Sequence, residues 1–229
     1  MAATHHEDSL VAHQFEDLEQ HHETANLGMW LFIAQEIMFF GGLFIAYLIY
    51  RMAYHTAWME SSHQLDVRIG TVNTFVLLGS SLSMALCARS AQVRNKGAVM
   101  GYLVTTMALG TVFLVVKYFE YNTKWDHHLV PGFHWQNAAW MTNGEMGHHQ
   151  LFFVFYFFMS GMHALHMVIG IGIMLVMLYA IWKHDKFLKG DFLTVEFVGY
   201  YWHFVDIVWV YLFPLLYLID RFQQTGGGH

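Results

Sequence analysis

The chain has 229 residues, of which 56% are apolar or aromatic and only 12% are charged. No basic run offers a surface to phosphates, and the net charge of −6 comes mainly from residues 1–26, so a nucleic-acid-binding protein is excluded. The single cysteine, Cys87, excludes an intrachain disulfide, a thiolate metal cage and an iron–sulfur cluster.

The chain begins with a polar segment over residues 1–26. This segment holds six acids, five histidines and no Lys or Arg, which is the opposite of the basic start of a signal peptide. We therefore expect an uncleaved, solvated arm on the cytoplasmic side. Binding of metal or sensing of pH by its histidines is the less favoured alternative.

Five stretches are almost free of Asp, Glu, Lys and Arg, over residues 27–50, 69–88, 97–116, 151–182 and 197–219. Each is long enough for the roughly 20 helical residues that cross a hydrocarbon layer. Backbone groups in lipid must be satisfied within their own segment, and strand-like alternation is absent, so these stretches predict helices. The predicted fold is all-α, an integral membrane bundle of five transmembrane helices over residues 27–220, with a flexible tail over 221–229.

Lys and Arg are concentrated in two short loops, one after the second stretch and one after the fourth: Arg89, Arg94, Lys96, Lys183, Lys186 and Lys189. Positive residues are retained on the cytoplasmic side of a membrane. We therefore expect the N-terminus in the cytoplasm and the C-terminus outside.

Ionisable residues inside or at the ends of the apolar stretches are the candidate site residues: Glu36, Lys117, Glu120, His163, His166, Glu196, His203 and Asp206. Each is costly at membrane depth unless it is paired or solvated. With a rise of about 1.5 Å per residue, Glu36, His203 and Asp206 fall in an inner layer. The other layer holds the Lys117–Glu120 pair and the two histidines of the fourth stretch.

The favoured interpretation of these residues is hydrogen bonding between helices or contact with lipid headgroups. A metal site is an alternative, because two histidines at i,i+3 and a carboxylate could ligate iron or zinc. The estimated depths separate the histidine pair from Glu36, so we expect neither a metal nor a catalytic residue. A proton path through Glu36, Asp206 and His203 is a further alternative. The simplest arrangement places Glu36 and His203 in one polar pocket, filled by a lipid headgroup or water.

Residues 196–212, EFVGYYWHFVDIVWVYL, resemble the last helix of subunit III of haem-copper terminal oxidases, where an acid stands seven residues before the His of a Tyr-Trp-His-Phe-Val-Asp block. Residues 31–47, LFIAQEIMFFGGLFIAY, resemble the family helix with a buried Glu, here Glu36. Two further segments, GMHALHMVIG at 161–170 and residues 117–121, are similar to family segments in the same order. Ala164 departs from the Gly of the family pattern.

The resemblance implies a bacterial five-helix subunit III of a cytochrome c oxidase, in the plasma membrane. Such a subunit would carry no haem or copper and would pack on the catalytic subunit I in a complex with subunit II. It would hold phospholipid in a cleft lined by Glu36 and His203, and support assembly, proton uptake and sustained turnover. Residues 117–132 favour cytochrome c as the donor. A quinol oxidase subunit III and a nitric oxide reductase accessory protein are the alternatives, and an independent membrane metalloenzyme is a more distant one.

Overall fold

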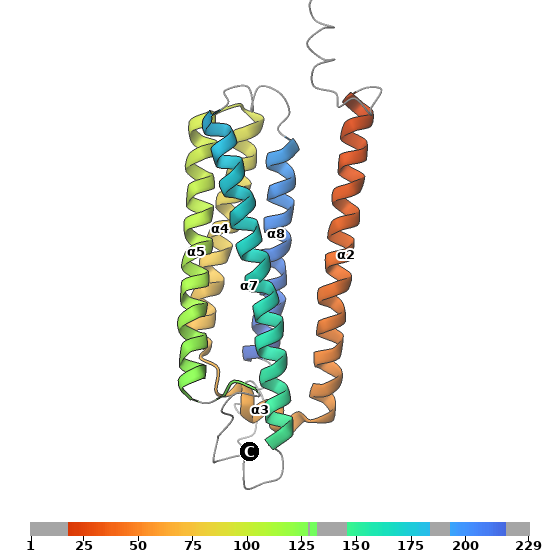
Figure 1. Cartoon of the computed structure of the whole chain (residues 1–229), viewed down its shortest axis with the longest axis vertical. Helices are drawn as coiled ribbons and strands as arrows, with labels where there is room; N and C mark the ends of the chain where they lie inside the picture. The colour runs from red at the N-terminus through yellow and green to blue at the C-terminus, as the bar shows by residue number, and fades with distance from the viewer. Residues whose placement is uncertain (1–17, 128, 132–145, 184–192, 219–229) are drawn as a thin grey trace, which may run out of the picture.

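The computed structural model describes residues 18–127, 129–131, 146–183 and 193–218, and these residues are mostly helical, with no strand among them (Figure 1). The α-helices are α2 (Leu18–Ala53), α3 (His55–Ser62), α4 (Val67–Gln92), α5 (Lys96–Asp126), α7 (Met146–Lys183) and α8 (Leu193–Phe213). A π-helix, η1 (Pro214–Leu218), continues α8. The predicted tail and most of the predicted N-terminal arm lie outside the described residues.

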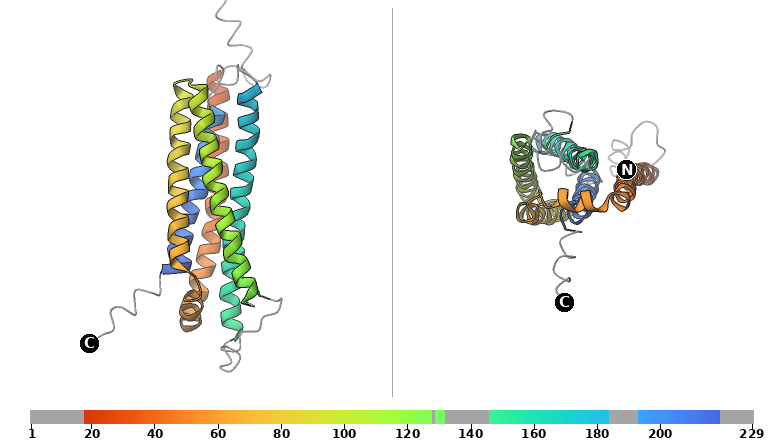
Figure 2. Two further views of the ribbon diagram at one scale, coloured as in Figure 1. Left: turned by 90° about the vertical axis from the view of Figure 1, so that its left-hand side faces the viewer. Right: turned by 90° about the horizontal axis from the view of Figure 1, so that it is seen from below.

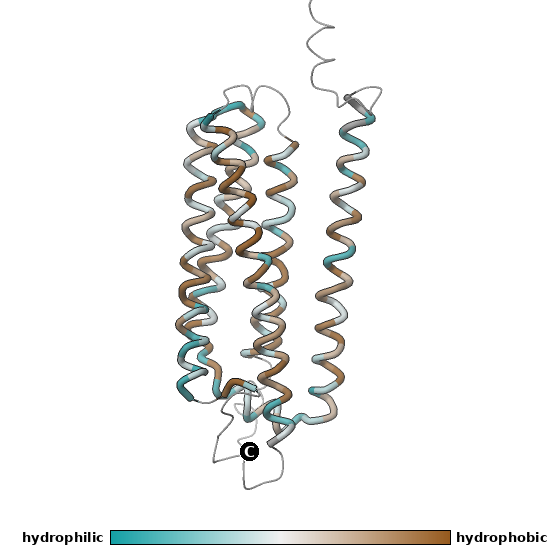
Figure 3. Tube along the Cα trace, viewed as in Figure 1, coloured by the Kyte–Doolittle hydropathy of each residue, from teal (hydrophilic) through white to brown (hydrophobic). Residues whose placement is uncertain are grey.

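Among the described residues, five helices are long and apolar enough to cross a membrane, and each coincides with one of the predicted stretches, so the predicted fold class is confirmed. The helices run beyond the apolar stretches: α2 already begins at Leu18, and α5 continues to Asp126. Hydropathy along the chain is highest in the middle of the helices and falls at their ends (Figure 3). The short helix α3, between the first two spanning helices, was not predicted.

Helices α4, α5, α7 and α8 form a four-helix bundle, and α2 stands beside it against α8 (Figure 2). Within the bundle α4 packs against α5 and α8, and α7 packs against α8 and α5. The N-terminal end of α2 and the α4–α5 loop lie at one end of the molecule (Figure 1). Helix α3 and η1 lie toward the opposite end, which we call the α3 end.

The bundle core is built around the fully buried indole ring of Trp202. Its Nε1 donates a hydrogen bond to Ser80 Oγ at 3.1 Å, which ties α8 to α4. The ring fits because Gly110 and Gly170 have no side chains: a Cβ on Gly110 would lie 2.8 Å from Trp202 Cη2. The bundle is therefore closely packed at its centre, whereas much of α2 is exposed.

Candidate functional site

Glu36 and His166 form a largely buried pair that links α2 to α7. His166 Nε2 lies 3.1 Å from Glu36 Oε2, and each side chain is 12% exposed. His166 Nδ1 lies 2.8 Å from the carbonyl oxygen of Met162. A carbonyl can only accept, so Nδ1 carries a proton in this geometry. The Glu36 bond then joins either an imidazolium to a carboxylate or a neutral imidazole to a carboxylic acid.

The Glu36–His166 pair borders an apolar groove between α2, α7 and α8. The adjoining cavity has a volume of about 420 Å³ and is lined by Met29, Phe32, Glu36, His166, Ile169, Ile173, Phe197, Val198 and Tyr201. It shares Ile169, Ile173 and Val198 with a second cavity of about 460 Å³ that reaches Met177 and Thr194. We call the two together the Glu36 groove. A space that is apolar along most of its length can take an acyl chain.

The predicted pairing of Glu36 with His203 is wrong. His203 Nδ1 lies 2.7 Å from Ser81 Oγ on α4, and His203 lines a different groove. The two residues do share a level along the helices, because the rings of Phe32 and Tyr201 lie 6.0 Å apart and those of Phe40 and Phe204 lie 6.1 Å apart. Glu36 and His203 lie on different sides of the α2–α8 contact. The depth of a residue along its helix does not show which side it faces.

The predicted separation in depth between His166 and Glu36 is also wrong. Helix α7 is 38 residues long, and α2 begins at Leu18, nine residues before the apolar stretch. The depth of Glu36, counted from the start of its apolar stretch, was therefore underestimated, whereas α7 ends only one residue beyond its apolar stretch. His166 reaches Glu36 because it lies near the middle of α7.

Lys117 and Glu120 form the second buried pair, as their i,i+3 spacing predicted. Lys117 Nζ lies 2.9 Å from Glu120 Oε2 and donates to the hydroxyl of Tyr217 at 2.9 Å. Glu120 Oε1 accepts hydrogen bonds from Tyr156 at 2.9 Å and from Tyr217 at 2.6 Å. These four residues, here the Lys117 cluster, join α5, α7 and η1.

Aromatic rings surround the ammonium group of the Lys117 cluster. Lys117 Nζ lies 4.8 Å from the ring centroid of Trp209 and between 5.4 and 5.8 Å from those of Tyr121, Tyr156 and Tyr217. A cation at these distances is attracted by the negative faces of the rings. The sequence did not single out the tyrosines, because no local pattern distinguishes them from the other tyrosines of the chain.

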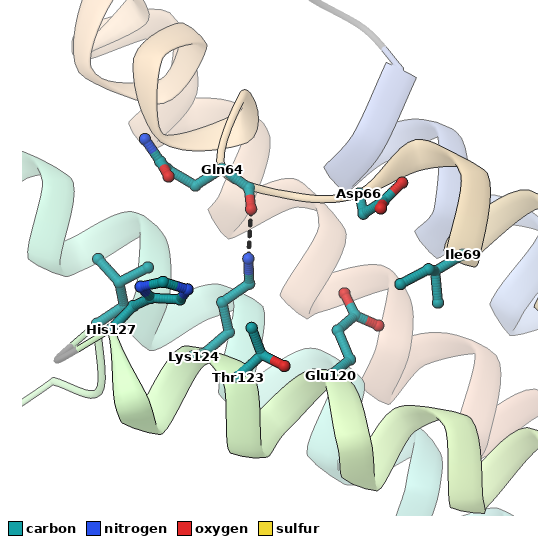
Figure 4. A pocket seen from close by; sticks show the side chains of 8 residues that line it. Gln64, Asp66, Ile69, Glu120, Thr123, Lys124 and His127 are labelled. Atoms are coloured by element: carbon teal, nitrogen blue, oxygen red, sulfur yellow. Dashed lines mark hydrogen bonds between the residues drawn. The ribbon is translucent and has the colours of Figure 1, made fainter.

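A polar pocket of about 490 Å³ opens beside Glu120 at the α3 end (Figure 4). Its wall carries Asp66, Thr123 and His127, and Lys124 Nζ donates to the backbone carbonyl of Gln64 there. Cationic and anionic groups thus alternate from the pocket wall to Lys117. The ion pair among these groups is Lys117–Glu120.

The remaining predicted site residues are not brought together. His163 is fully buried, its ring packs against Phe113 and Trp209, and neither ring nitrogen has a hydrogen-bond partner among the described residues. Asp206 is buried near Ser81, and its carboxylate oxygens likewise find no partner in the described ranges. Glu196 accepts a hydrogen bond from Gln92 Nε2 at 3.0 Å. Within the residues that the structure covers, no three His, Cys, Asp or Glu side chains gather as metal ligands.

The amino-acid sequence is similar to those of known oxidase subunits over most of its length. The family model described as cytochrome c oxidase subunit III matches residues 12–220. A cytochrome c oxidase subunit 3 of Corynebacterium diphtheriae is 32% identical over 198 residues, covering 85% of this chain and 88% of the relative. A cytochrome bo(3) ubiquinol oxidase subunit 3 of Pseudomonas aeruginosa is 28% identical, covering 84% and 83%. A heme-copper oxidase subunit I+III of Aeropyrum pernix is 29% identical, covering 83% of this chain and 22% of that longer protein.

Proposed function

Because the chain belongs to the cytochrome c oxidase subunit III family, we propose that it is the non-catalytic subunit III of a proton-pumping oxidase that takes electrons from cytochrome c. The observation that carries this proposal is the family match, which spans all five transmembrane helices. Haem and copper would reside in partner subunits, where oxygen is reduced. This chain would support assembly, proton uptake and sustained turnover.

The proposed partners are the catalytic subunit I and subunit II. In the Aeropyrum pernix relative, the name of one polypeptide joins subunits I and III, which supports a direct contact with subunit I. Purification through a tag on this chain should yield a complex that contains both partners, shows haem absorbance and oxidises cytochrome c. Oxidation of quinol alone would overturn the assignment of the donor, and recovery with a nitric oxide reductase would overturn the oxidase.

A phospholipid in the Glu36 groove is the proposed ligand of this chain. The groove offers apolar walls along α7 and α8, and midway along the helices the Glu36–His166 pair holds α2 against α7 at its side. Acyl chains would lie along the walls and stabilise the contact of α2 with the bundle. Lipid analysis should find phospholipid that the native complex retains and that the Glu36→Ala complex loses. A delipidated complex is the reference.

The proposed orientation has the N-terminus in the cytoplasm. The N-terminal end of α2 and the α4–α5 loop lie at the same end of the molecule (Figure 1). The loop carries Arg94, and Lys96 follows it as the first residue of α5. Retention of positive loops inside supports placing this end in the cytoplasm. A cysteine at Asp126 should react with an impermeant reagent on intact cells, and one at Asn95 should not. The reverse pattern would invert the orientation.

The metalloenzyme alternative makes a different prediction about the isolated chain. An independent metal centre would leave about one metal ion per chain after chelator washing. We expect elemental analysis of the washed subunit to find less than about a tenth of that amount. A zinc-binding protein that is washed in the same way is the control.

A further inference from the structure

A second groove, here the His203 groove, runs along the other side of the α2–α8 contact. Its volume is about 510 Å³. The lining positions on α2 are 30, 33, 37, 40, 41 and 44, and those on α8 are 200, 203, 204, 207, 208 and 211. Except for His203 and two tyrosines, these residues are glycine or apolar. The groove faces outward from the bundle, since Ile37 and Ile207 are both more than half exposed.

The spacing of the lining positions is that of a helix-packing seam. On α2 the steps 30, 33, 37, 40 and 44 alternate between three and four residues, which places these side chains on one stripe of the helix. On α8 the positions 200, 204, 207 and 211 follow steps of four, three and four. The two helices run parallel, because two contacts between them follow in the same order along each. The ring of Phe32 contacts that of Tyr201, and further along Tyr47 donates a hydrogen bond to the carbonyl of Leu215 in η1, which continues α8. Two parallel stripes that face one groove are the geometry that receives a third helix.

His203 supplies a polar group midway along the His203 groove. It lies ten residues after Leu193 and fifteen before Leu218, the ends of the spanning segment, and therefore near the middle of the membrane. Ser81 Oγ bonds Nδ1 at 2.7 Å, which fixes the ring and leaves Nε2 for another partner. Acyl chains offer no hydrogen-bonding group, and the polar part of a phospholipid lies at the membrane surface. A group at this depth is satisfied by protein.

We infer that the His203 groove seats a transmembrane helix of another subunit of the oxidase, with an apolar stripe and one hydrogen-bonding side chain opposite His203. This inference rests on the proposed function, because it requires that the chain be assembled with other membrane subunits. A second copy of this chain fits less well. A symmetric dimer would bring the same surface of both copies together, and two facing grooves leave a void.

Photo-crosslinking of the assembled oxidase in its membrane tests this inference. A benzophenone amino acid at Ile207, in the groove, should crosslink to one transmembrane segment of another subunit, identified by mass spectrometry. The same probe at Val115, a half-exposed valine on α5, is the matched control and should not label that segment. Adducts of Ile207 with lipid alone, or with a second copy of this chain, would overturn the inference. Equal labelling of one segment from both positions would overturn it as well.

Substitution of His203 tests the hydrogen bond separately. His203→Leu should increase the loss of this subunit from the complex in detergent about three- to tenfold, and His203→Gln should restore most of the retention. Equal retention of wild type and His203→Leu would show that no partner group meets His203. If the proposed function itself fails, the tagged wild-type chain recovers no oxidase subunits, an outcome that precedes and differs from all of these.

Discussion

The two buried pairs of this chain, Lys117–Glu120 and Glu36–His166, are built differently. Tyrosines from α7 and η1 close the first, so that three elements share one network, and both charged side chains are 5% exposed. The second joins only α2 and α7, is 12% exposed on each side and borders a groove. The first pair has the features of an interaction that stabilises the packing of the bundle helices. The second has the features of a contact that a ligand can support.

The difference explains how one chain can combine a rigid bundle with a loosely attached helix. Helix α2 is held by the Glu36–His166 pair, by ring contacts such as Phe40 with Phe204, and by the hydrogen bond from Tyr47 to the carbonyl of Leu215. On both sides of its contact with α8 there is a groove. Lipid and a partner helix would complete the packing of α2, whereas the four-helix bundle is complete by itself.

The largest expected effect comes from opening the Lys117 cluster. Glu120→Leu leaves the ammonium of Lys117 buried without its carboxylate, which should lower the free energy of unfolding by about 3–5 kcal/mol. Reversible unfolding in mixed micelles measures this loss. Glu196→Gln, which alters an acid whose hydrogen-bond partner among the described residues is Gln92, is the control and should change stability by less than about 0.5 kcal/mol.

The double variant Lys117→Leu with Glu120→Leu removes both charges and should recover part of the lost stability, because no uncompensated ion remains. If Glu120→Leu had the same free energy of unfolding as the wild type, the Lys117 cluster would not stabilise the bundle.

A smaller loss is expected from Gly110→Ala in the bundle core. The new methyl group would lie 2.8 Å from Trp202, in a core that has no room for it, and should cost about 1–3 kcal/mol. Gly42→Ala on α2 is the matched control: nothing lies within 4 Å of its Cβ position, so stability should be unchanged or raised. Equal effects of the two variants in the same unfolding assay would contradict the contrast between a packed bundle and an open α2.

A loss of about 0.5–1.5 kcal/mol is expected from Tyr47→Phe, which removes the hydrogen bond to the carbonyl of Leu215 and keeps the ring. Hydrogen exchange should show faster opening of α2 and unchanged protection in α5. Faster exchange throughout the bundle would mean that α2 and the bundle unfold as one unit.

Sequence patterns were sufficient for the spanning helices but not for what lies between them. The long charge-free stretches are a strong signal because lipid tolerates few ionised groups. Helix α3 has eight residues, and Tyr54 at its N-cap makes no side-chain capping bond, so it carries no recognisable start. Tertiary contacts of Trp58 with Tyr47 and Phe152 accompany its docking at the α3 end.

The site was predictable in part for a related reason. The Lys117–Glu120 pair is local, and its i,i+3 spacing on one helix predicts contact. The partners of Glu36 come from other helices, so their identity depends on the rotation of each helix about its axis. Depth placed Glu36 and His203 at one level but could not show which neighbouring helix each side chain faces. The real partner, His166, was assigned to another level because α2 begins nine residues before its apolar stretch, so Glu36 lies deeper than was counted.

The most direct test of the account is the activity of the Glu36→Ala oxidase over time. If the Glu36 groove holds lipid and this chain conducts no electrons, the assembled variant should keep its haem content and its initial rate of oxygen reduction, while it retains less lipid and inactivates after fewer turnovers. Glu60→Ala, which alters a largely exposed acid at the α3 end, should match the wild type in all four measurements. Immediate loss of oxygen reduction in a fully assembled Glu36→Ala complex would instead place Glu36 in the catalytic machinery.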